Sequence, residues 1–271
     1  MEVHGIDWED AFANAAYIDS GMDYPDRWER DAEAFRLKAN AELDLPYGAA
    51  PRERFDLFRP ASEPRGLAVF VHGGYWLSFD QSSWSHLAEG ALSSGWAVAL
   101  PTYTLAPEAR IHEITRSIGR AVTAAAKLVP GPIRLAGHSA GGHLVSRMVC
   151  DDTPLDEATA DRITRVVSIS GLHDLRPLQL HSMNAQLKLD EQEATSESAA
   201  LRSPRPNTEL VAWVGARERP EFLRQSALIA EAWRRKGSRA DLVADPGRHH
   251  FDVIEGLADP NHPLTRAYIG P

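Results

Sequence analysis

Short apolar runs recur along the chain, and each is followed by a segment with helical spacing. Residues 67–71 are all apolar, as expected of a strand that is buried on both faces of a sheet. Further apolar-rich runs lie at 96–100, 133–136, 163–169 and 210–214. Residues 111–122 carry isoleucine and valine at three- and four-residue steps, which indicates an amphipathic helix. Strands that alternate with helices predict an α/β fold, with a mostly parallel central sheet and helices on both faces.

The 271 residues fit one large domain of this kind, 1–271. The first fifty residues, about 1–50, are rich in Trp, Asp, Glu and Ala and are predicted to be a helical extension, with Trp28, Phe35 and Leu37 at least partly on one face. Residues 172–206 are long and weakly periodic, and we expect a short cap-like insert there. In a parallel sheet, chemistry is expected at the carboxyl ends of the strands.

Charge and composition exclude several classes of function. The net charge of −9 disfavours a nucleic-acid partner, because phosphate contacts need clustered Lys and Arg. There is no basic run for a membrane surface and no apolar stretch of bilayer length. Cys150 is the only cysteine, and neither a His-Glu-x-x-His motif nor a Walker-type loop occurs. The N-terminus does not resemble a signal peptide. We therefore expect a cytoplasmic protein that acts on a small molecule without metal or cofactor.

Residues 137–141 read Gly-His-Ser-Ala-Gly, a pattern typical of a serine nucleophile on a tight turn between a strand and a helix. The pattern alone is a weak signal, since Gly and Ser are common. Its context strengthens it, because the apolar run 133–136 precedes it and a helical segment at 142–149 follows. Flanking glycines avoid collisions in such a turn, and the helix N-terminus stabilises negative charge. We predict that Ser139 is the nucleophile of a hydrolase.

A second glycine turn directly follows the strand predicted at 67–71, where such folds place the other half of an oxyanion hole. The candidates for holding the oxyanion are the main-chain N–H groups of Gly73, Gly74, Tyr75 and Ala140. The side chains of Tyr75 and Trp76 are candidate walls of a substrate pocket, although aromatic residues at such positions are as often ordinary core.

The serine needs a base, and in this order of elements the base comes late in the chain. His250 follows the last predicted strand, at 241–244, and we prefer it to its neighbour His249. The acid that orients the histidine should lie between serine and histidine in the sequence. Glu218, after the strand at 210–214 and before a helix, is our candidate. Its main rival is Asp174, and weaker rivals are Asp245 and Asp252.

Together these motifs resemble the kynurenine formamidase (arylformamidase) branch of the α/β-hydrolases, which is related to the hormone-sensitive-lipase-like esterases. The resemblance runs over most of the chain and is strongest at 72–76 (His-Gly-Gly-Tyr-Trp), 137–144 and 170–178, with further support at 103–107 and 217–222. It implies an α/β-hydrolase fold in which Ser139, His250 and Glu218 form the catalytic triad. The acid of that family is normally aspartate, so Glu218 departs from it in length but not in charge.

Three functions follow. The resemblance implies a serine hydrolase that removes a small acyl group, formyl, from an aryl amide like N-formyl-kynurenine through an acyl-enzyme. A broad carboxylesterase that acts on short acyl esters would use the same triad. A catalytically inactive α/β-hydrolase that serves as a binding protein is disfavoured, because every catalytic position has an occupant. A homodimer is a further expectation.

Overall fold

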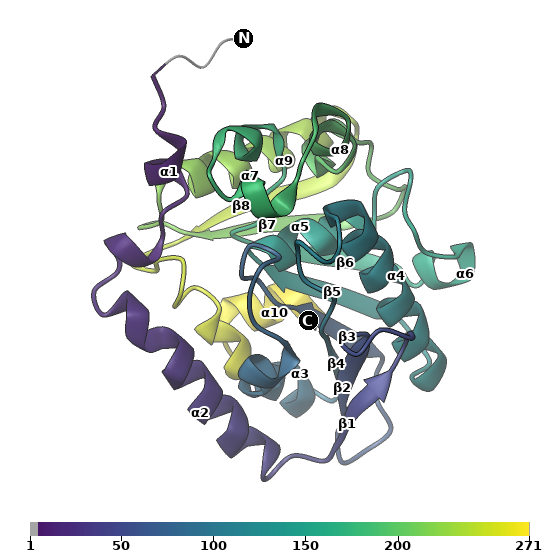
Figure 1. The fold of residues 1–271 in the computed structure, drawn as a ribbon. Coiled ribbons are helices and arrows are strands. Elements are labelled where there is room, and N and C mark those ends of the chain that lie inside the picture. Colours follow the sequence, from purple (N-terminus) through teal and green to yellow (C-terminus); the bar gives the residue numbers. More distant parts are fainter. Residues whose placement is uncertain (1–4, 271) are drawn as a thin grey trace.

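A twisted central sheet organises the molecule (Figure 1). Within residues 5–270, which the computed structural model describes, the sheet has eight strands in the order β1-β2-β4-β3-β5-β6-β7-β8. The strands are β1 (Ala41–Pro46), β2 (Arg54–Phe58), β3 (Leu67–Val71), β4 (Ala97–Pro101), β5 (Ile133–His138), β6 (Ile163–Ile169), β7 (Glu209–Gly215) and β8 (Arg239–Asp245). β1 and β2 are antiparallel, and β3 to β8 are parallel to one another. The predicted fold class is confirmed.

Helices cover both faces of this sheet because alternate residues of the strands point to opposite sides. The helices are α1 (Trp8–Ala11), α2 (Tyr24–Arg36), α3 (Glu89–Ser93), α4 (Ile111–Leu128), α5 (Ala140–Arg147), α6 (Glu157–Ala160), α7 (Asn184–Leu187), α8 (Glu191–Ser196), α9 (Pro220–Arg235) and α10 (Pro263–Ile269). The shorter 3-10 turns are η1 (Ala15–Tyr17), η2 (Gly21–Asp23), η3 (Gln81–Ala88), η4 (Arg176–Leu180), η5 (Ala199–Leu201) and η6 (Glu255–Ala258).

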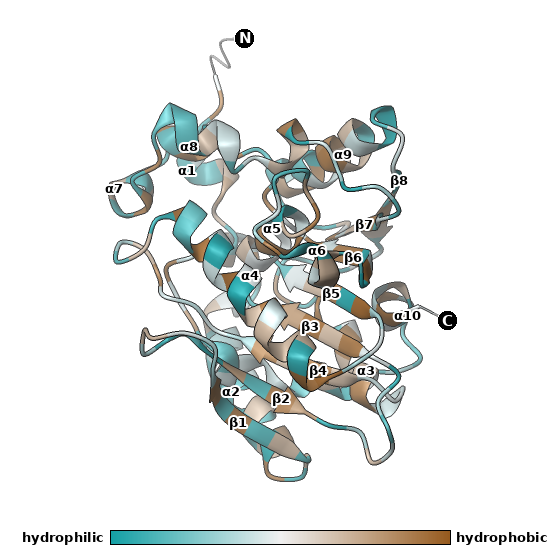
Figure 2. Ribbon diagram, turned by 90° about the vertical axis from the view of Figure 1, so that its right-hand side faces the viewer, coloured by the Kyte–Doolittle hydropathy of each residue, from teal (hydrophilic) through white to brown (hydrophobic). Residues whose placement is uncertain are grey.

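The core consists of two apolar layers, one on each side of the sheet. Leu67, Val69 and Val71 of β3 belong to the layer under α4, α5 and α9. Ala68 and Phe70 belong to the opposite layer, with α2, α3 and α10. In Figure 2 the central strands are largely brown, whereas α4, which lies across them, carries teal residues toward the viewer. The alternation explains why β3 is apolar throughout, since both of its faces are covered.

The N-terminal region differs in part from the prediction. α1 and α2 are helical, but Ala41–Pro46 is an antiparallel edge strand that pairs with β2. Trp28 and Phe35 are buried on one face of α2, whereas Leu37 is 85% exposed. The alternating polar and apolar residues of β1 match an edge strand with most of its side chains in solvent, a two-residue period that the prediction of helix from composition overlooked.

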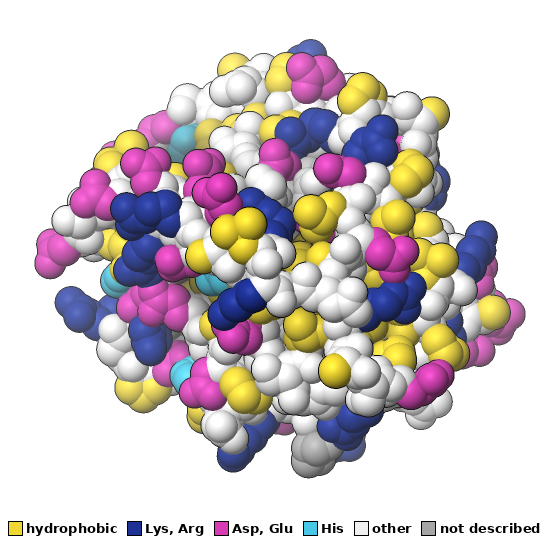
Figure 3. All heavy atoms as spheres, turned by 90° about the horizontal axis from the view of Figure 1, so that it is seen from below, with side chains coloured by type: hydrophobic (Ala, Val, Ile, Leu, Met, Phe, Trp, Pro, Cys, Tyr) yellow, Lys and Arg dark blue, Asp and Glu magenta, His cyan; other side chains and the backbone are white. Residues whose placement is uncertain are grey.

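The surface mixes charges of both signs. On the face shown in Figure 3, Lys and Arg side chains lie between Asp and Glu side chains. Exposed ion pairs of the molecule, such as Arg59 with Glu42 and Lys38 with Glu89, contribute little to stability. None of the helices in residues 5–270 combines the length and the apolar character that a bilayer span requires.

Candidate active site

Ser139 occupies a strained turn between β5 and α5. Its backbone is left-handed, with φ 55° and ψ −117°, and its N–H donates to the Ile169 carbonyl at 2.8 Å. A side-chain carbon on Gly141 would lie 2.0 Å from the Val71 carbonyl oxygen, so only glycine lets α5 start against the end of β3. The structure therefore has the strand–turn–helix arrangement that the Gly-x-Ser-x-Gly pattern predicts.

The second glycine loop lies directly against this turn. A side-chain carbon on Gly73 would come within 3.0 Å of Ser139 Cβ and 2.8 Å of the His138 carbonyl oxygen. Gly74, Tyr75 and Trp76 follow with three consecutive positive φ angles, of 102°, 53° and 60°. For the two non-glycine residues such a conformation costs about 1–3 kcal/mol each, and it persists only where neighbouring contacts impose it. Strain of this kind concentrates at functional sites.

Buried hydrogen bonds hold the loop in place. The His72 ring donates from Nδ1 to the Gly73 carbonyl at 2.8 Å and stacks on Tyr103 with centroids 4.5 Å apart. Burial lowers the pKa of His72 to about 4, so the ring stays neutral. The Tyr103 hydroxyl donates to the His72 carbonyl at 3.2 Å. On the far side, the Tyr75 hydroxyl donates to the Phe12 carbonyl at 2.7 Å, which ties the loop to the N-terminal segment.

The structure brings the predicted base and acid into contact. Nδ1 of His250 lies 2.6 Å from Oε2 of Glu218, and the Glu218 carboxylate is fully shielded from solvent. Its other oxygen, Oε1, accepts hydrogen bonds from the Gly215 N–H at 2.7 Å and from the Ser170 hydroxyl. With three donors the carboxylate is fixed in place, and because it accepts from Nδ1 of His250, the ring proton lies on that nitrogen. His250 can then accept a proton only at Nε2.

Two rings enclose the imidazole of His250. Phe222 lies 4.4 Å away between centroids and His138 4.7 Å away. His138 donates from Nε2 to the His250 carbonyl at 2.8 Å. Burial lowers the pKa of His138 well below the ordinary value, and the charge of His250 acts in the same direction. His138 is therefore a neutral packing partner rather than a competing base.

The rival carboxylates are committed elsewhere. Asp174 forms a bidentate ion pair with Arg176, at 2.8 and 2.9 Å. The Asp245 carboxylate accepts from the indole of Trp213 at 3.2 Å, and that of Asp252 accepts from the His249 N–H at 2.7 Å. Of the four candidate acids, Glu218 is the one that contacts His250.

Ser170 is a residue of the site that sequence reasoning missed. It directly follows β6 and has φ 53°, and its hydroxyl fixes the Glu218 carboxylate. The segment 170–178 contributed to the resemblance, but nothing local in it marks Ser170 as a partner of a residue 48 positions away. The contact follows from the neighbouring positions of β6 and β7 in the sheet.

Ser139 and His250 line one pocket of about 400 Å³, which lies in the size range of small-molecule sites. Its walls are strongly aromatic, with Trp28, Tyr75, Phe79, Trp84 and Phe251. Among the described residues that line it, there is no Asp, Glu, Lys or Arg. An uncharged aromatic cavity favours a substrate with an apolar aromatic part.

The N-terminal segment forms much of this wall, which the sequence analysis did not foresee. Residues 13–16, Gly21, Met22, Pro25 and Trp28 all line the pocket. In Figure 1 this purple segment runs down one side of the molecule beside the yellow C-terminal residues, and Trp28 packs edge-on against Phe251 at 5.5 Å. The predicted cap at 172–206 contributes Met183.

Tyr75 and Trp76, the two residues predicted to form walls of the pocket, lie in different surroundings. Tyr75 lines the pocket, together with Gly74. Trp76 does not: it has no solvent exposure, packs edge-on against His143 at 5.2 Å and accepts the Ala106 N–H at its carbonyl. The successive left-handed residues turn the Trp76 side chain into the core, so the structure corrects its assignment as a wall. Gly73 and Ala140 are not among the residues that line the pocket, but both lie next to Ser139. Ala140 begins α5, where main-chain N–H groups have no partner within the helix.

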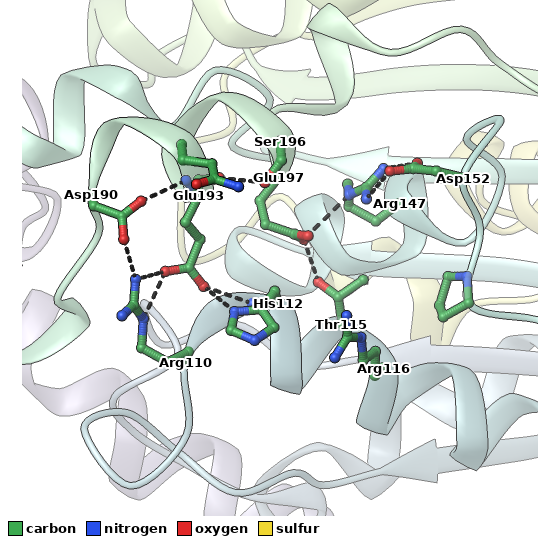
Figure 4. A pocket seen from close by; sticks show the side chains of 12 residues that line it. Arg110, His112, Thr115, Arg116, Arg147, Asp152, Asp190, Glu193, Ser196 and Glu197 are labelled. Atoms are coloured by element: carbon green, nitrogen blue, oxygen red, sulfur yellow. Dashed lines mark hydrogen bonds and ion pairs between the residues drawn. The ribbon is translucent and has the colours of Figure 1, made fainter.

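A second hollow, of about 480 Å³, lies between α4, α5 and α8 (Figure 4). Its buried Glu197 accepts from Thr115 at 2.7 Å and from Arg147 at 3.2 Å, and Arg147 also forms a bidentate pair with Asp152. The Glu193 carboxylate lies within ion-pair distance of the Arg110 guanidinium and the His112 ring. Because these charged groups are already paired with one another, the network links the segment 172–206 to α5, the helix that follows Ser139. No cluster of three or more potential metal ligands occurs within residues 5–270.

The class of protein follows from where these groups lie, because α/β-hydrolases carry a nucleophilic serine on a strand–turn–helix at the carboxyl ends of a parallel sheet. Comparison with known families agrees: residues 68–251 match the family described as alpha/beta hydrolase fold. The chain belongs to this family.

Among its relatives, the chain is 28% identical to a kynurenine formamidase from Danio rerio, over 88% of this chain and 84% of the other. A crystal structure from Silicibacter sp. TM1040, described as a candidate thioesterase, is 53% identical with a TM-score of 0.93, covering 97% of this chain and 99% of that one. An esterase from Pyrobaculum calidifontis shares the fold alone, with 17% identity, a TM-score of 0.70, and coverage of 96% and 94%. The resemblance to a kynurenine-formamidase-like α/β-hydrolase is thus confirmed.

Proposed function

We propose that this enzyme is a serine hydrolase that releases a formyl group from an aryl amide. The observation that carries the proposal is the contact between His250 and the shielded carboxylate of Glu218, at one end of an uncharged aromatic pocket that Ser139 also lines. The similarity to a kynurenine formamidase over most of the chain supports the same reaction.

In the proposed mechanism, Nε2 of His250 takes the hydroxyl proton of Ser139 as the serine oxygen bonds to the formyl carbon. The main-chain N–H groups of Ala140 and of the 73–75 loop stabilise the oxyanion, and each such donor contributes about 3–4 kcal/mol to transition-state stability. The imidazolium then protonates the leaving nitrogen, and the C–N bond breaks to give the arylamine and a formyl-serine. Water, deprotonated by His250, hydrolyses this ester and releases formate.

The pocket suits this substrate class in size and polarity. A formyl group is small and asks for little room beside Ser139, and the aromatic leaving group can pack on Trp28, Trp84 and Phe251. Since no charged side chain lines the pocket within the described residues, a charged amino-acid head group would have to extend out of it.

The test is turnover of N-formyl-kynurenine and of formanilide, with Ser139→Ala as the control variant. Removing a serine nucleophile lowers kcat by about a million-fold in enzymes of this mechanism. We expect a comparable loss with little change in thermal unfolding, because the substitution removes a single oxygen atom. Activity retained in Ser139→Ala would refute the nucleophile, and absence of turnover by the wild-type protein would favour the inactive binding protein.

A second candidate is hydrolysis of short acyl esters or thioesters. The similar protein from Silicibacter sp. TM1040, described as a candidate thioesterase, favours this candidate. Comparing kcat/KM for formanilide, a p-nitrophenyl ester and an acyl thioester separates the two. A preference for either ester of more than about a hundredfold, beyond their higher intrinsic reactivity, would overturn the formamidase proposal. The cytoplasmic location and the homodimer stay predictions, which fractionation and light scattering can test.

A further inference from the structure

The wall of the catalytic pocket consists largely of aromatic carbon. The pocket, of about 400 Å³, can take up a small aromatic molecule as a whole, and its described lining residues include no Asp, Glu, Lys or Arg. The rings of Trp28, Phe79 and Trp84 pack on one another there, with centroids between 4.6 and 5.9 Å apart. Both indole N–H groups are buried, so a ligand meets the carbon atoms of these rings. An ionised group that enters the pocket therefore exchanges water for aromatic surface, which is unfavourable.

The polar side chains of the lining do not replace the lost water. The Tyr75 hydroxyl donates to a main-chain carbonyl at 2.7 Å and accepts from Asn14 Nδ2 at 3.3 Å. His138 donates to the His250 carbonyl at 2.8 Å, and burial lowers the pKa of His138 well below its ordinary value, so its ring supplies no positive charge. The exposed Ser78 also lines the pocket, but a single neutral hydroxyl cannot solvate a carboxylate.

Charged groups beside the pocket do not favour an amino-acid head group either. Met22 lines the pocket and is 78% exposed, and the exposed residues Asp19 and Asp23 lie close to it in the chain. Their negative charge disfavours a further carboxylate nearby. Arg219, which contacts the same N-terminal segment, is already paired with Asp10. A head group that extends from the pocket on this side therefore meets negative charge and an arginine that is already paired.

We propose that the enzyme selects aryl amides whose leaving group is uncharged, and that it discriminates against N-formyl-kynurenine, whose leaving group carries an ionised amino acid. This inference rests on the proposed function for its reaction and names the substrate class of that site. An aromatic face attracts an ammonium group, but it repels the carboxylate on the same carbon, so the two effects oppose each other. An uncharged arylamine gives up no ionic hydration on entry and keeps the apolar contacts with the rings.

The test compares N-formyl-kynurenine with the N-formyl derivative of ortho-aminoacetophenone. The second compound keeps the formamide, the ring and the ortho ketone, but it has no ionised group. We expect kcat/KM of the wild-type protein to be at least about tenfold higher for this neutral amide. The difference should lie mainly in KM, because the reacting group is the same in both compounds. Equal values, or a preference for N-formyl-kynurenine, would overturn the inference.

The exposed side chain of Met22 allows a matched pair of variants. Both are made in an Asp23→Asn background, so that this neighbour does not neutralise an added charge. Met22→Arg supplies a cation for the substrate carboxylate, and it should raise kcat/KM for N-formyl-kynurenine relative to the neutral amide by about two- to fivefold, the effect of one exposed ion pair. Met22→Gln, which adds a neutral polar group, should leave this ratio as it is. No rise in Met22→Arg, or an equal rise in Met22→Gln, would contradict the role assigned to charge.

A binding experiment keeps this proposal separate from the proposed function. In Ser139→Ala, the dissociation constants of the two amides are measured by calorimetry, and N-formyl-kynurenine should bind at least about tenfold more weakly than the neutral amide. Equal or tighter binding of N-formyl-kynurenine would refute the selection. If the wild-type protein hydrolyses neither amide, the proposed function fails, and the two dissociation constants still decide whether the pocket selects an uncharged ligand.

Discussion

Glu218→Gln should disable the base by trapping it in the wrong tautomer. Oε1 of Glu218 accepts from the Gly215 N–H and from the Ser170 hydroxyl, and Oε2 accepts from His250 Nδ1. A glutamine has one carbonyl oxygen, and the main-chain N–H of Gly215 keeps that oxygen at the Oε1 position. The NH₂ group then faces His250, which must accept at Nδ1 and carry its proton on Nε2. In this tautomer the imidazole cannot take the proton of Ser139.

The size of the effect follows from the contacts. Turning the glutamine amide to restore the correct tautomer leaves the buried Gly215 N–H without an acceptor, which costs about 1–3 kcal/mol. The Ser170 hydroxyl can rotate and accept, so it adds little. Losing the charge-assisted bond to the imidazolium costs about 1.5–3 kcal/mol more. We therefore expect kcat/KM to fall by about two to four orders of magnitude.

Steady-state kinetics over a range of pH are the assay. Because the defect lies in the tautomer rather than in the protonation state, raising the pH should not restore activity. Asp174→Asn is the matched control, since Asp174 is paired with Arg176 and does not contact His250. The reasoning fails if Glu218→Gln loses less than about tenfold, or if Asp174→Asn loses as much.

Three further predictions concern stability, each measured by urea denaturation. Gly141→Ala would place its methyl 2.0 Å from the Val71 carbonyl oxygen and should destabilise the fold by at least about 1–3 kcal/mol; a neutral result would contradict the tight start of α5. Arg147→Met leaves the shielded Glu197 carboxylate without its cation and should cost about 3–5 kcal/mol, against about 1 kcal/mol or less for Arg205→Met at an exposed pair; equal losses would count against the buried network. Burial raises the pKa of Glu197, but the charge of Arg147 and the hydrogen bonds it receives outweigh this and hold the pKa below 4.5, so its contribution is present above about pH 4.5 and is lost as the pH falls through the folded-state value. Glu197→Gln should remove that acid-dependent part, and an unchanged pH profile would refute the assignment.

The parts of the site that could be predicted are those with a local signal. Apolar runs marked the strands, and a glycine pattern between a strand and a helix marked the turn of Ser139. Glu218 and His250 were found from their order after particular strands, and the structure places them in contact. Each of these signals is contained in a few consecutive residues.

The parts that could not be predicted depend on contacts between distant segments. Asn14 is hydrogen-bonded to Tyr75, which lies 61 residues further along the chain, and Ser170 is hydrogen-bonded to Glu218, which lies 48 residues further. The edge strand β1 is a different case: its alternation of polar and apolar residues is a local signal, and the prediction of helix for 1–50 followed the composition of the segment instead. Trp76 was misplaced because three successive left-handed residues redirect its side chain, and no sequence pattern announces such a backbone.

The part of the pocket wall formed by residues 13–28 comes from a different stretch of the chain than the proposed reacting groups. The residues proposed to carry out the reaction all lie within 68–251, the part that the hydrolase family shares, whereas this wall lies before it. The pocket therefore combines a wall from the N-terminal segment with walls from the shared part, such as Trp84 and Phe251. Replacing residues in the N-terminal wall should alter the fit of a substrate while the proposed reacting groups stay as they are.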